Sequence, residues 1–332
     1  MTKSTIVIPN YNGINYIQAC LESLYCGTTK DIRVIVVDNA STDGSMELVR
    51  DKFPQVQLIV NQTNTGFSHA VNQGIKESAT PYVILLNNDT QADISFVHEL
   101  EKVMDDDKDR RIFSASAKLV SLYDRNATDD AGDFYCALGW AFARGKGKTP
   151  DRYRRDCDIF ASCAGAAIYR RELLEENRVG LFDEEHFAYF EDIDIGYRAK
   201  IYGYRNRFAA NSIVYHAGSA TSGSRYNRFK TKLASRNSIY VVYKNMPFLQ
   251  ILLNLPFLMA GFLVKTLFFA KKGMGRDYAA GLAGGVRLCM SAAGRSHRQK
   301  FDAAKFGNYV SIQLALWRNL LRLFEKSEAK RS

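Results

Sequence analysis

The segment PYVILLNNDT, Pro81–Thr90, is the part of the sequence from which the fold can best be inferred. Its short, continuous apolar run is typical of a strand buried on both faces. The run stops at Leu86 and is followed at once by Asn87, Asn88 and Asp89. A surface turn would account for these side chains. A site for a metal ion and a diphosphate would account for them too, because Mg²⁺ is commonly held by one or two carboxylates together with substrate phosphates.

Three similar apolar runs precede this one in the chain. They alternate with amphipathic segments at helical spacing, and this alternation predicts a mostly parallel α/β sheet covered by helices on both faces. Ligands of such sheets bind beyond the carboxyl ends of the strands. All four predicted strands end in Asn, Asp or Gly, so we expect a pocket for a polar ligand at that edge. The strands are predicted at 4–9, 32–38, 56–60 and 82–86, and the helices at 14–25, 45–52, 66–78 and 94–105.

The remaining chain suggests a division into a catalytic domain and a helical region. Residues 1–105 would form a nucleotide-binding half, and 106–225, with a strand at 112–120 and a polar excursion at 123–156, an acceptor half. Residues 226–332 would form a helical C-terminal region. The charge is divided similarly, since residues 221–332 hold 20 Lys/Arg against 4 Asp/Glu, a net charge of +16, whereas residues 1–220 carry −6.

The C-terminal region combines its positive charge with apolar runs. Residues 227–244 have the pattern of a basic helix, 248–264 are almost wholly apolar, and 309–324 are amphipathic. We predict helices that lie on an anionic membrane surface. An internal helical subdomain and a true membrane span remain alternatives, although the apolar run is at the short limit for a span. A nucleic-acid partner is disfavoured because the charge is interleaved with apolar runs and no recognition motif is present.

Several classes of protein are disfavoured by what the sequence lacks. The N-terminus has neither the apolar core nor the cleavage site of a signal peptide, so we expect a cytosolic start. The six cysteines are scattered without a CxxC pair, which argues against a zinc site or a disulfide framework and favours reduced thiols. There is no GxGxxG after the first strand and no P-loop, so a nicotinamide or flavin cofactor is disfavoured.

Three further positions are candidates for chemistry, each with a structural alternative. Asp38 ends a predicted strand and can accept hydrogen bonds from a ribose or a base, or simply form an Asx turn. Glu191, Asp192 and Asp194 lie near a predicted helix start, where carboxylates can serve as a general base or stabilise the helix N-terminus. His216 ends another predicted strand and is either a metal ligand or, as is commoner for a lone histidine, structural.

Seven motifs occur in one order along the chain, and together they resemble glycosyltransferase family 2, whose members are inverting enzymes of the GT-A fold. The resemblance extends over roughly residues 4–245. The NND motif and the downstream histidine are similar to the bacterial rhamnosyltransferase branch, close to galactofuranosyltransferases. The motifs are IVIPNYNG (6–13), VVDNASTDGS (36–45), NTGFSHAVNQGI (64–75), LLNNDT (85–90), CAGAAIYRRE (163–172), FDEEHFAYFEDIDIGYR (182–198) and YHAGSAT (215–221).

The resemblance implies a role for each matching residue. Asp192 would be the catalytic base and Glu191 would help to hold the acceptor. Asp89 and His216 would bind Mg²⁺ or Mn²⁺. Many relatives have Asp where this chain has Asn87 and Asn88, which is a departure that bears on metal affinity. The donor would be bound by Pro9, Asn10, Tyr11, Asp38, Asn64, Gly66, Asn88 and Asp89.

The function implied by the resemblance is transfer of a sugar from a nucleotide-sugar donor to a lipid-linked glycan acceptor in bacterial cell-surface polysaccharide synthesis. The best single prediction is rhamnose from dTDP-rhamnose. The enzyme would act as a peripheral protein on the cytoplasmic face of the plasma membrane. One alternative is a galactofuranosyl-, N-acetylglucosaminyl- or glucosyltransferase that uses a UDP-sugar. An alternative of another class is a nucleic-acid-binding protein that acts through the basic tail.

Overall fold

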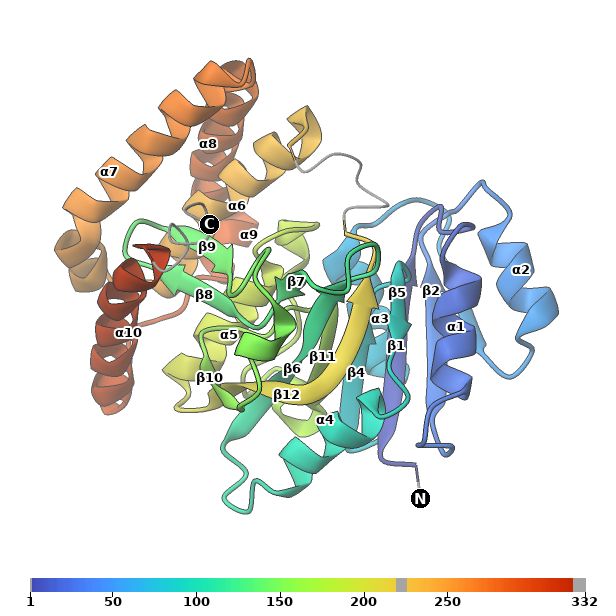
Figure 1. Ribbon diagram of the computed structural model, residues 1–332. Helices are drawn as coiled ribbons and strands as arrows, with labels where there is room; N and C mark the ends of the chain where they lie inside the picture. Colours follow the sequence, from blue (N-terminus) through green and yellow to red (C-terminus); the bar gives the residue numbers. More distant parts are fainter. Residues whose placement is uncertain (1, 219–225, 325–332) are drawn as a thin grey trace.

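The computed structural model describes residues 2–218 and 226–324 and is built around one large sheet (Figure 1). Four of its strands are parallel neighbours in the order β4-β1-β2-β3. In register, Asn10 lies beside Asp38, so the polar strand ends meet at one edge as the sequence predicts. The strands are β1 (Ser4–Asn10), β2 (Arg33–Asp38), β3 (Gln57–Val60) and β4 (Tyr82–Leu86).

The other half of the sheet contains strands of both directions. β11 (Ala166–Arg170) is antiparallel to both β4 and β6 (Ile112–Ser121), and β12 (Arg205–His216) runs parallel to β6. Three short strands complete the sheet: β5 (Thr90–Ala92), β7 (Thr128–Asp130) and β10 (Cys157–Ile159). β5 pairs with the end of β12, with Thr90 opposite His216. This pairing brings Asp89, which precedes Thr90, close to His216, the predicted histidine ligand.

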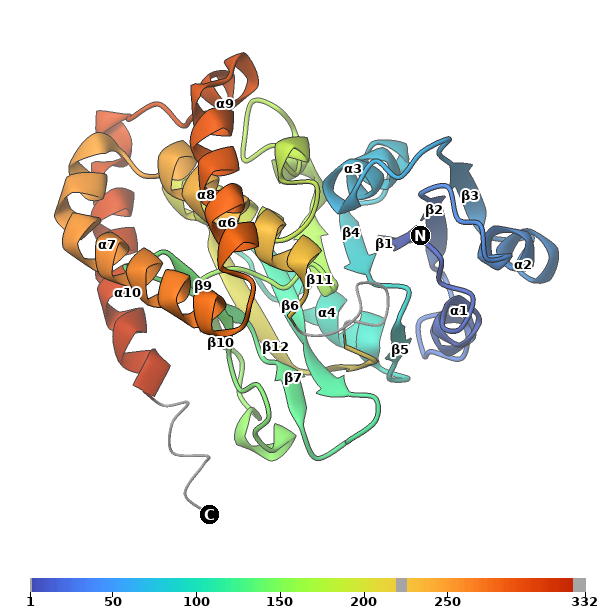
Figure 2. The same cartoon turned by 90° about the horizontal axis from the view of Figure 1, so that it is seen from above.

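Helices cover both faces of the sheet, as Figure 2 shows from above. Alternate residues of β1 point to opposite faces, so that Ile6 and Ile8 belong to one apolar core and Val7 to another. The first core is covered by α1 (Ile17–Tyr25), α2 (Ser45–Lys52) and α4 (Phe96–Asp105), and the second by α3 (Phe67–Glu77) and α5 (Glu191–Ile201). The predicted α/β architecture is therefore confirmed.

The polar excursion at 123–156 contains structure that the sequence pattern did not predict. β8 (Asp133–Cys136) and β9 (Trp140–Ala143) form a separate two-stranded sheet. Tyr135 is fully buried, and Trp140 donates a hydrogen bond to the Gly261 carbonyl at 3.1 Å. This hairpin therefore connects the N-terminal part of the chain, residues 2–218, with the C-terminal helices. All six cysteines are free thiols, as expected.

Within residues 226–324, five α-helices gather on the side of the molecule away from β3 (Figure 2). Their apolar residues share a core with the N-terminal part of the chain. In this core Tyr197 packs with residues such as Val241, Leu258 and Leu316. The predicted boundary near residue 225 stays a prediction, but the two parts are packed together. The helices are α6 (Arg228–Asn245), α7 (Phe248–Lys271), α8 (Gly275–Met290), α9 (Ala292–Ser296) and α10 (Phe306–Phe324).

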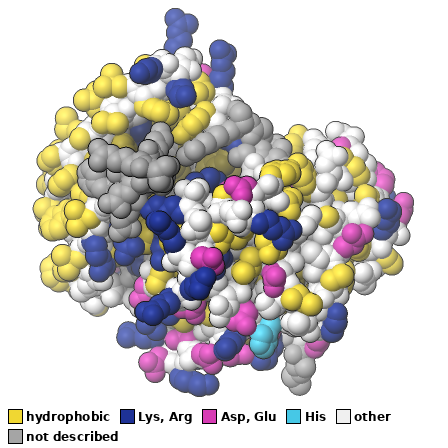
Figure 3. Space-filling view, in the orientation of Figure 1, with side chains coloured by type: hydrophobic (Ala, Val, Ile, Leu, Met, Phe, Trp, Pro, Cys, Tyr) yellow, Lys and Arg dark blue, Asp and Glu magenta, His cyan; other side chains and the backbone are white. Residues whose placement is uncertain are grey.

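Helix α7 is longer than the apolar run from which it was predicted. It has polar side chains on its buried face and large apolar side chains on its exposed face. Among the described helices it alone has the length and apolar composition of a membrane span. Its inward face carries Gln250 and Asn254, and Asn254 exchanges two hydrogen bonds of 2.8 Å with Gln313 of α10. Its outward face carries large apolar side chains: Leu249, Leu252, Leu253, Met259, Leu263 and Leu267. In the space-filling view, apolar side chains gather on the left, over α7 (Figure 3).

Candidate active site

A cleft of about 1080 Å³ opens beyond the carboxyl ends of the parallel strands. It is bounded by the loops after β1 and β4, by the segment before α5 and by the start of α6. Among the residues to which the family resemblance assigns a role, Asp38 alone does not line it. The residues that do are Pro9, Asn10, Tyr11, Asn64, Gly66, Asn88, Asp89, Glu191, Asp192 and His216.

The wall at the strand ends is held by a chain of buried side chains. Asn88 donates to the Asn10 side-chain oxygen at 2.7 Å, and Asn10 donates to Asp38 at 2.8 Å. Asp38 is fully buried and also accepts from the backbone N–H and the hydroxyl of Ser41. Asp38 therefore supports the wall from behind, in the turn geometry that the sequence left as an alternative. Direct contact between Asp38 and a nucleotide stays a prediction.

The loop before α3 requires a glycine at the cleft. Gly66 has φ of +86°, and its N–H donates to the Asn64 side chain at 3.0 Å. A Cβ atom at Gly66 would lie 2.6 Å from the Phe187 ring. Any side chain here would therefore combine an unfavourable backbone conformation with a clash. The contact also joins the two sides of the cleft, because Phe67 N–H donates to the Phe187 carbonyl at 2.6 Å.

Asp89 and His216 meet in the cleft, as the resemblance implied. The Asp89 carboxylate lies 3.2 Å from His216 Nε2, and Nδ1 on the other side of the ring contacts Asp129 at 2.7 Å. Asp129 is in turn paired with Lys146. Burial opposes protonation of the imidazole, but hydrogen bonds to Asp129 and Asp89 outweigh it and raise the pKa of His216 to about 9.

This pair fits a divalent cation in donor type and in spacing. Oxygen and imidazole nitrogen are ordinary ligands of Mn²⁺, and Mg²⁺ prefers oxygen. Neighbouring ligands of an octahedral Mg²⁺ lie about 3 Å apart, given metal–ligand distances of 2.0–2.1 Å, which is close to the observed separation. Asp129 holds the outer nitrogen of the ring, an arrangement that commonly orients metal-binding histidines.

The opposite side of the cleft carries acids at the start of α5. Burial raises the pKa of Asp192, and burial together with the Asp192 charge raises the pKa of Glu191 well above its usual range. One oxygen of Glu191 is buried without a hydrogen-bond partner. Asp133 is hydrogen-bonded to Asp192 and to Asp130, and burial raises the pKa of Asp130 to about 7. Such carboxyl groups suit proton transfer near neutral pH.

The sequence reasoning missed several residues of the cleft. Asp133 lines the cleft, and Asp129 contacts His216 without lining the cleft. Both lie in the acidic run TDDAGD, whose density of carboxylates was a usable signal. Arg228 and Lys230, at the start of α6, also line the cleft, but nothing in their local pattern distinguishes them from other basic residues. The last three residues of the predicted motif YHAGSAT, 219–221, lie outside the described residues.

Comparison with known proteins identifies relatives over most of the chain. An N-acetylglucosaminyl-diphospho-decaprenol L-rhamnosyltransferase of Mycobacterium tuberculosis is 24% identical over 241 residues, which is 66% of this chain and 77% of that protein. Two further curated relatives are 34% and 36% identical over about 30% of the chain, and the matched segment spans 15% of their length.

Solved structures share the fold at lower identity. TarS 1–349 of S. aureus in complex with UDP-GlcNAc superposes with a TM-score of 0.58 at 16% identity, covering 95% of this chain and 91% of that one. The mannosyltransferase PcManGT of Pyrobaculum calidifontis, in complex with GDP-Man and Mn²⁺, gives 0.51 at 18% identity, covering 94% and 87%. The model of the family described as "Glycosyl transferase family 2" matches residues 5–178, more than half of the sequence. The chain therefore belongs to glycosyl transferase family 2.

Proposed function

We propose that this protein is an inverting, metal-dependent glycosyltransferase that moves a sugar from a nucleotide donor to a hydroxyl of a glycan acceptor. The observation that carries the proposal is the position of the Asp89–His216 pair and Asp192 in one cleft, beyond the polar strand ends. The Asp89–His216 pair suits a cation that balances the charge of a diphosphate leaving group. Asp192 suits removal of a proton from the attacking hydroxyl. Family membership supports the same reaction class.

In the proposed reaction the donor lies over Asn10, Asn64 and Gly66 with its diphosphate toward Asp89. Asp89 and His216 hold a divalent cation, Mg²⁺ or Mn²⁺, which when bound neutralises the charge on the leaving diphosphate. Asp192 accepts the proton of the acceptor hydroxyl as its oxygen attacks C1 from the face opposite the leaving group, which inverts the configuration. Glu191, beside it, orients the acceptor.

The donor we propose is dTDP-rhamnose, because the NND motif and the downstream histidine resemble the rhamnosyltransferase branch and one relative is named as an L-rhamnosyltransferase. The test is a binding and hydrolysis panel of nucleotide sugars with purified protein and Mg²⁺ or Mn²⁺. Metal-dependent preference for dTDP-rhamnose is the expected result. Preference for a UDP-sugar would change the donor and keep the mechanism. Binding to none of the donors, with salt-sensitive binding to a random DNA duplex, would overturn the proposal and favour a nucleic-acid function.

We further propose that the acceptor is a lipid-linked glycan in bacterial cell-surface polysaccharide synthesis and that the enzyme is peripheral on the cytoplasmic face of the plasma membrane. The support is helix α7, which directs its polar Gln250 and Asn254 inward and all of its leucines except Leu258 outward. Exposed apolar surfaces of this extent mark interaction sites. Lys271 and Lys272 lie at the end of this helix and Arg276 lies at the start of α8, and such charges are attracted to anionic lipid.

The membrane proposal is tested with three substitutions on one stripe of α7: Met259→Glu, Leu263→Glu and Leu267→Glu. These side chains are exposed and spaced four residues apart, so the variant should fold while losing affinity for anionic vesicles. A matched control carries Val60→Glu and Ile94→Glu, which are exposed apolar positions in the nucleotide-binding half. Equal vesicle binding by all three proteins would contradict the proposal.

A further inference from the structure

The segment that leads into the proposed base is a strained turn that depends on outside support. Phe187, Tyr189 and Phe190 have φ of 61°, 68° and 71°, values that are unfavourable for residues other than glycine. Such conformations are unfavourable and persist only where the surroundings enforce them. All of the residues 187–190 line the cleft, and Glu191 and Asp192 follow directly. Whatever enforces this turn also sets the position of the base.

One side chain of the C-terminal region is bonded to the whole turn. The amide nitrogen of Asn237, in the middle of α6, lies 2.8, 2.9 and 2.7 Å from the carbonyl oxygens of His186, Ala188 and Tyr189, so its two N–H groups are shared among three acceptors. Asn237 is fully buried. Its oxygen accepts a hydrogen bond from Arg236 at 3.0 Å, which directs the amide N–H groups toward the turn.

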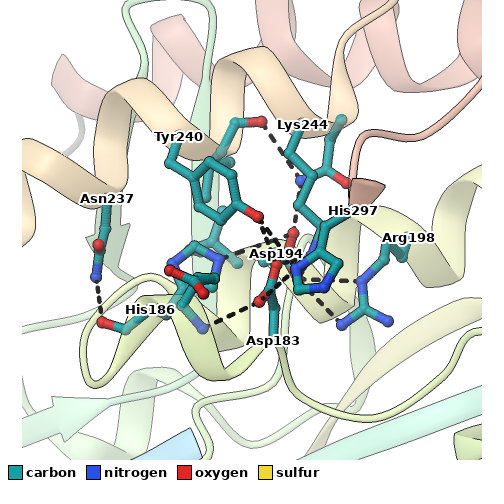
Figure 4. A network of polar contacts seen from close by, with 12 residues as sticks. Asp183, His186, Asp194, Arg198, Asn237, Tyr240, Lys244 and His297 are labelled. Carbon is teal, nitrogen blue, oxygen red and sulfur yellow. Dashed lines mark hydrogen bonds and ion pairs between the residues drawn. The ribbon is translucent and has the colours of Figure 1, made fainter. Parts of the chain in front are cut away.

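The two ends of the segment are fixed to the same helix. The ammonium group of Lys244 contacts Asp183, before the turn, at 2.6 Å, and Asp194, after it, at 2.9 Å (Figure 4). Tyr240 donates to Asp183 at 2.8 Å. Asp183, His186 and Asp194 have the composition of a metal site, but Lys244 already bonds to both carboxylates. The side chains of this cluster therefore join α6 both to α5 and to the segment before it.

We propose that Asn237 is a positioning residue for glycosyl transfer: by holding the carbonyls of the 186–190 turn it places Asp192 and the aromatic wall of the cleft. The C-terminal helices would then be part of the catalytic machinery as well as a possible membrane contact. The inference rests on the proposed function in one respect, namely that Asp192 acts as the base. It assigns to α6 a role that the division at residue 225 does not include.

The variant that tests this is Asn237→Asp. The substitution keeps the shape and the acceptor for Arg236 but removes the donor and places a carboxylate against three carbonyl oxygens. A misplacement of about 1 Å can cost on the order of 10²-fold in rate. We therefore expect kcat for hydrolysis or transfer of the preferred donor to fall by that order. Nucleotide affinity should fall less, because of the proposed donor contacts Asn10, Gly66 and Asn88 only Gly66 packs against the turn, at Phe187. Asn10 and Asn88 are held at the strand ends by the bond between them and by that of Asn10 to Asp38. Amide hydrogens of residues 186–188 should exchange faster.

The matched control is Asn254→Asp, another fully buried asparagine of the C-terminal helices, which bonds to Gln313 and not to the turn. It should lose stability without the change in kcat or in exchange at 186–188. A folded Asn237→Asp protein with wild-type kcat and exchange would overturn the inference. If that variant does not fold, Asn237→Ser removes the amide without adding charge and is judged by the same criteria. If the wild type turns over no donor, the proposed function fails, and hydrogen exchange alone decides the positioning role.

Discussion

Two acids on helix α5 lie two residues apart and have opposite environments. Burial raises the pKa of Asp192, which faces the cleft. Burial would also raise the pKa of Asp194, but the charges of Lys244 and Arg198 outweigh it and hold that pKa well below its usual range. Arg198 Nε donates to Asp194 at 3.0 Å, and Asn245 donates at 2.8 Å. One carboxylate is left to take up a proton, and the other is fixed as an anion.

The difference shows that the composition of an acidic cluster does not by itself indicate its role. A buried carboxylate with cations around it contributes to stability and resists protonation. For Asp192, burial outweighs the hydrogen bonds that favour its anion, including the one with Asp133, so its carboxyl group is costly to ionise and is suited to proton transfer. The cations that distinguish the two come from α6 and from the next turn of α5.

The largest effect is expected for Asp192→Asn. Loss of a general base typically lowers the rate by about 10²–10⁴-fold, whereas donor affinity should remain because the strand-end wall is untouched. The variant should be at least as stable as the wild type, since it removes a buried acid whose ionisation is unfavourable. The rate of turnover measures the first effect, and the midpoint of urea unfolding measures the second. Turnover close to that of the wild type would show that Asp192 is not the base. Asp194→Asn, in contrast, should lower the unfolding midpoint.

The next effect is expected for Lys244→Met, which leaves two buried carboxylates without their shared cation. Breaking a buried ion pair by removing one partner typically costs about 3–5 kcal/mol. The matched control is Lys3→Met. Lys3 contacts Asp105 at 2.7 Å, but both side chains are more than one-third exposed, and exposed pairs contribute about 0–1 kcal/mol. Urea unfolding of both variants is the measurement, and equal losses would contradict the distinction between the two pairs.

Local pattern in the sequence was sufficient for the parallel half of the sheet and for its polar edge. The strands β1 to β4 begin and end within one or two residues of the predicted ranges, because apolar runs and amphipathic periodicity are local signals. The Asp89–His216 pair came from family resemblance. Its geometry depends on β5 pairing with β12, and no local pattern predicts that pairing.

The division of labour between Asp192 and Asp194 was not predicted, although part of it was predictable. Residues two apart on a helix point about 200° away from each other, so both acids could not face one cleft. Their partners could not be inferred in the same way. Lys244 is 50 residues from Asp194 in the chain, and only the packing of α6 against α5 brings them together.

The smallest effect is expected at the edge of this cluster, at His297. The ring nitrogen Nδ1 lies 3.0 Å from Asp183, and the side chain is 44% exposed. The hydrogen bond to Asp183 raises the pKa of His297, while burial and Lys244 act in the opposite direction. A raised folded pKa contributes stability that is fully present below the unfolded value of about 6.5 and is lost as pH rises through the folded pKa. His297→Gln should therefore be less stable than the wild type at pH 6, by at most about 1 kcal/mol given its exposure. The difference should shrink toward alkaline pH.

His98→Gln, at an exposed position of α4, is the control. A difference that stays constant with pH would mean that His297 contributes by packing, and that the charge balance of the cluster ends at Lys244 and Arg198.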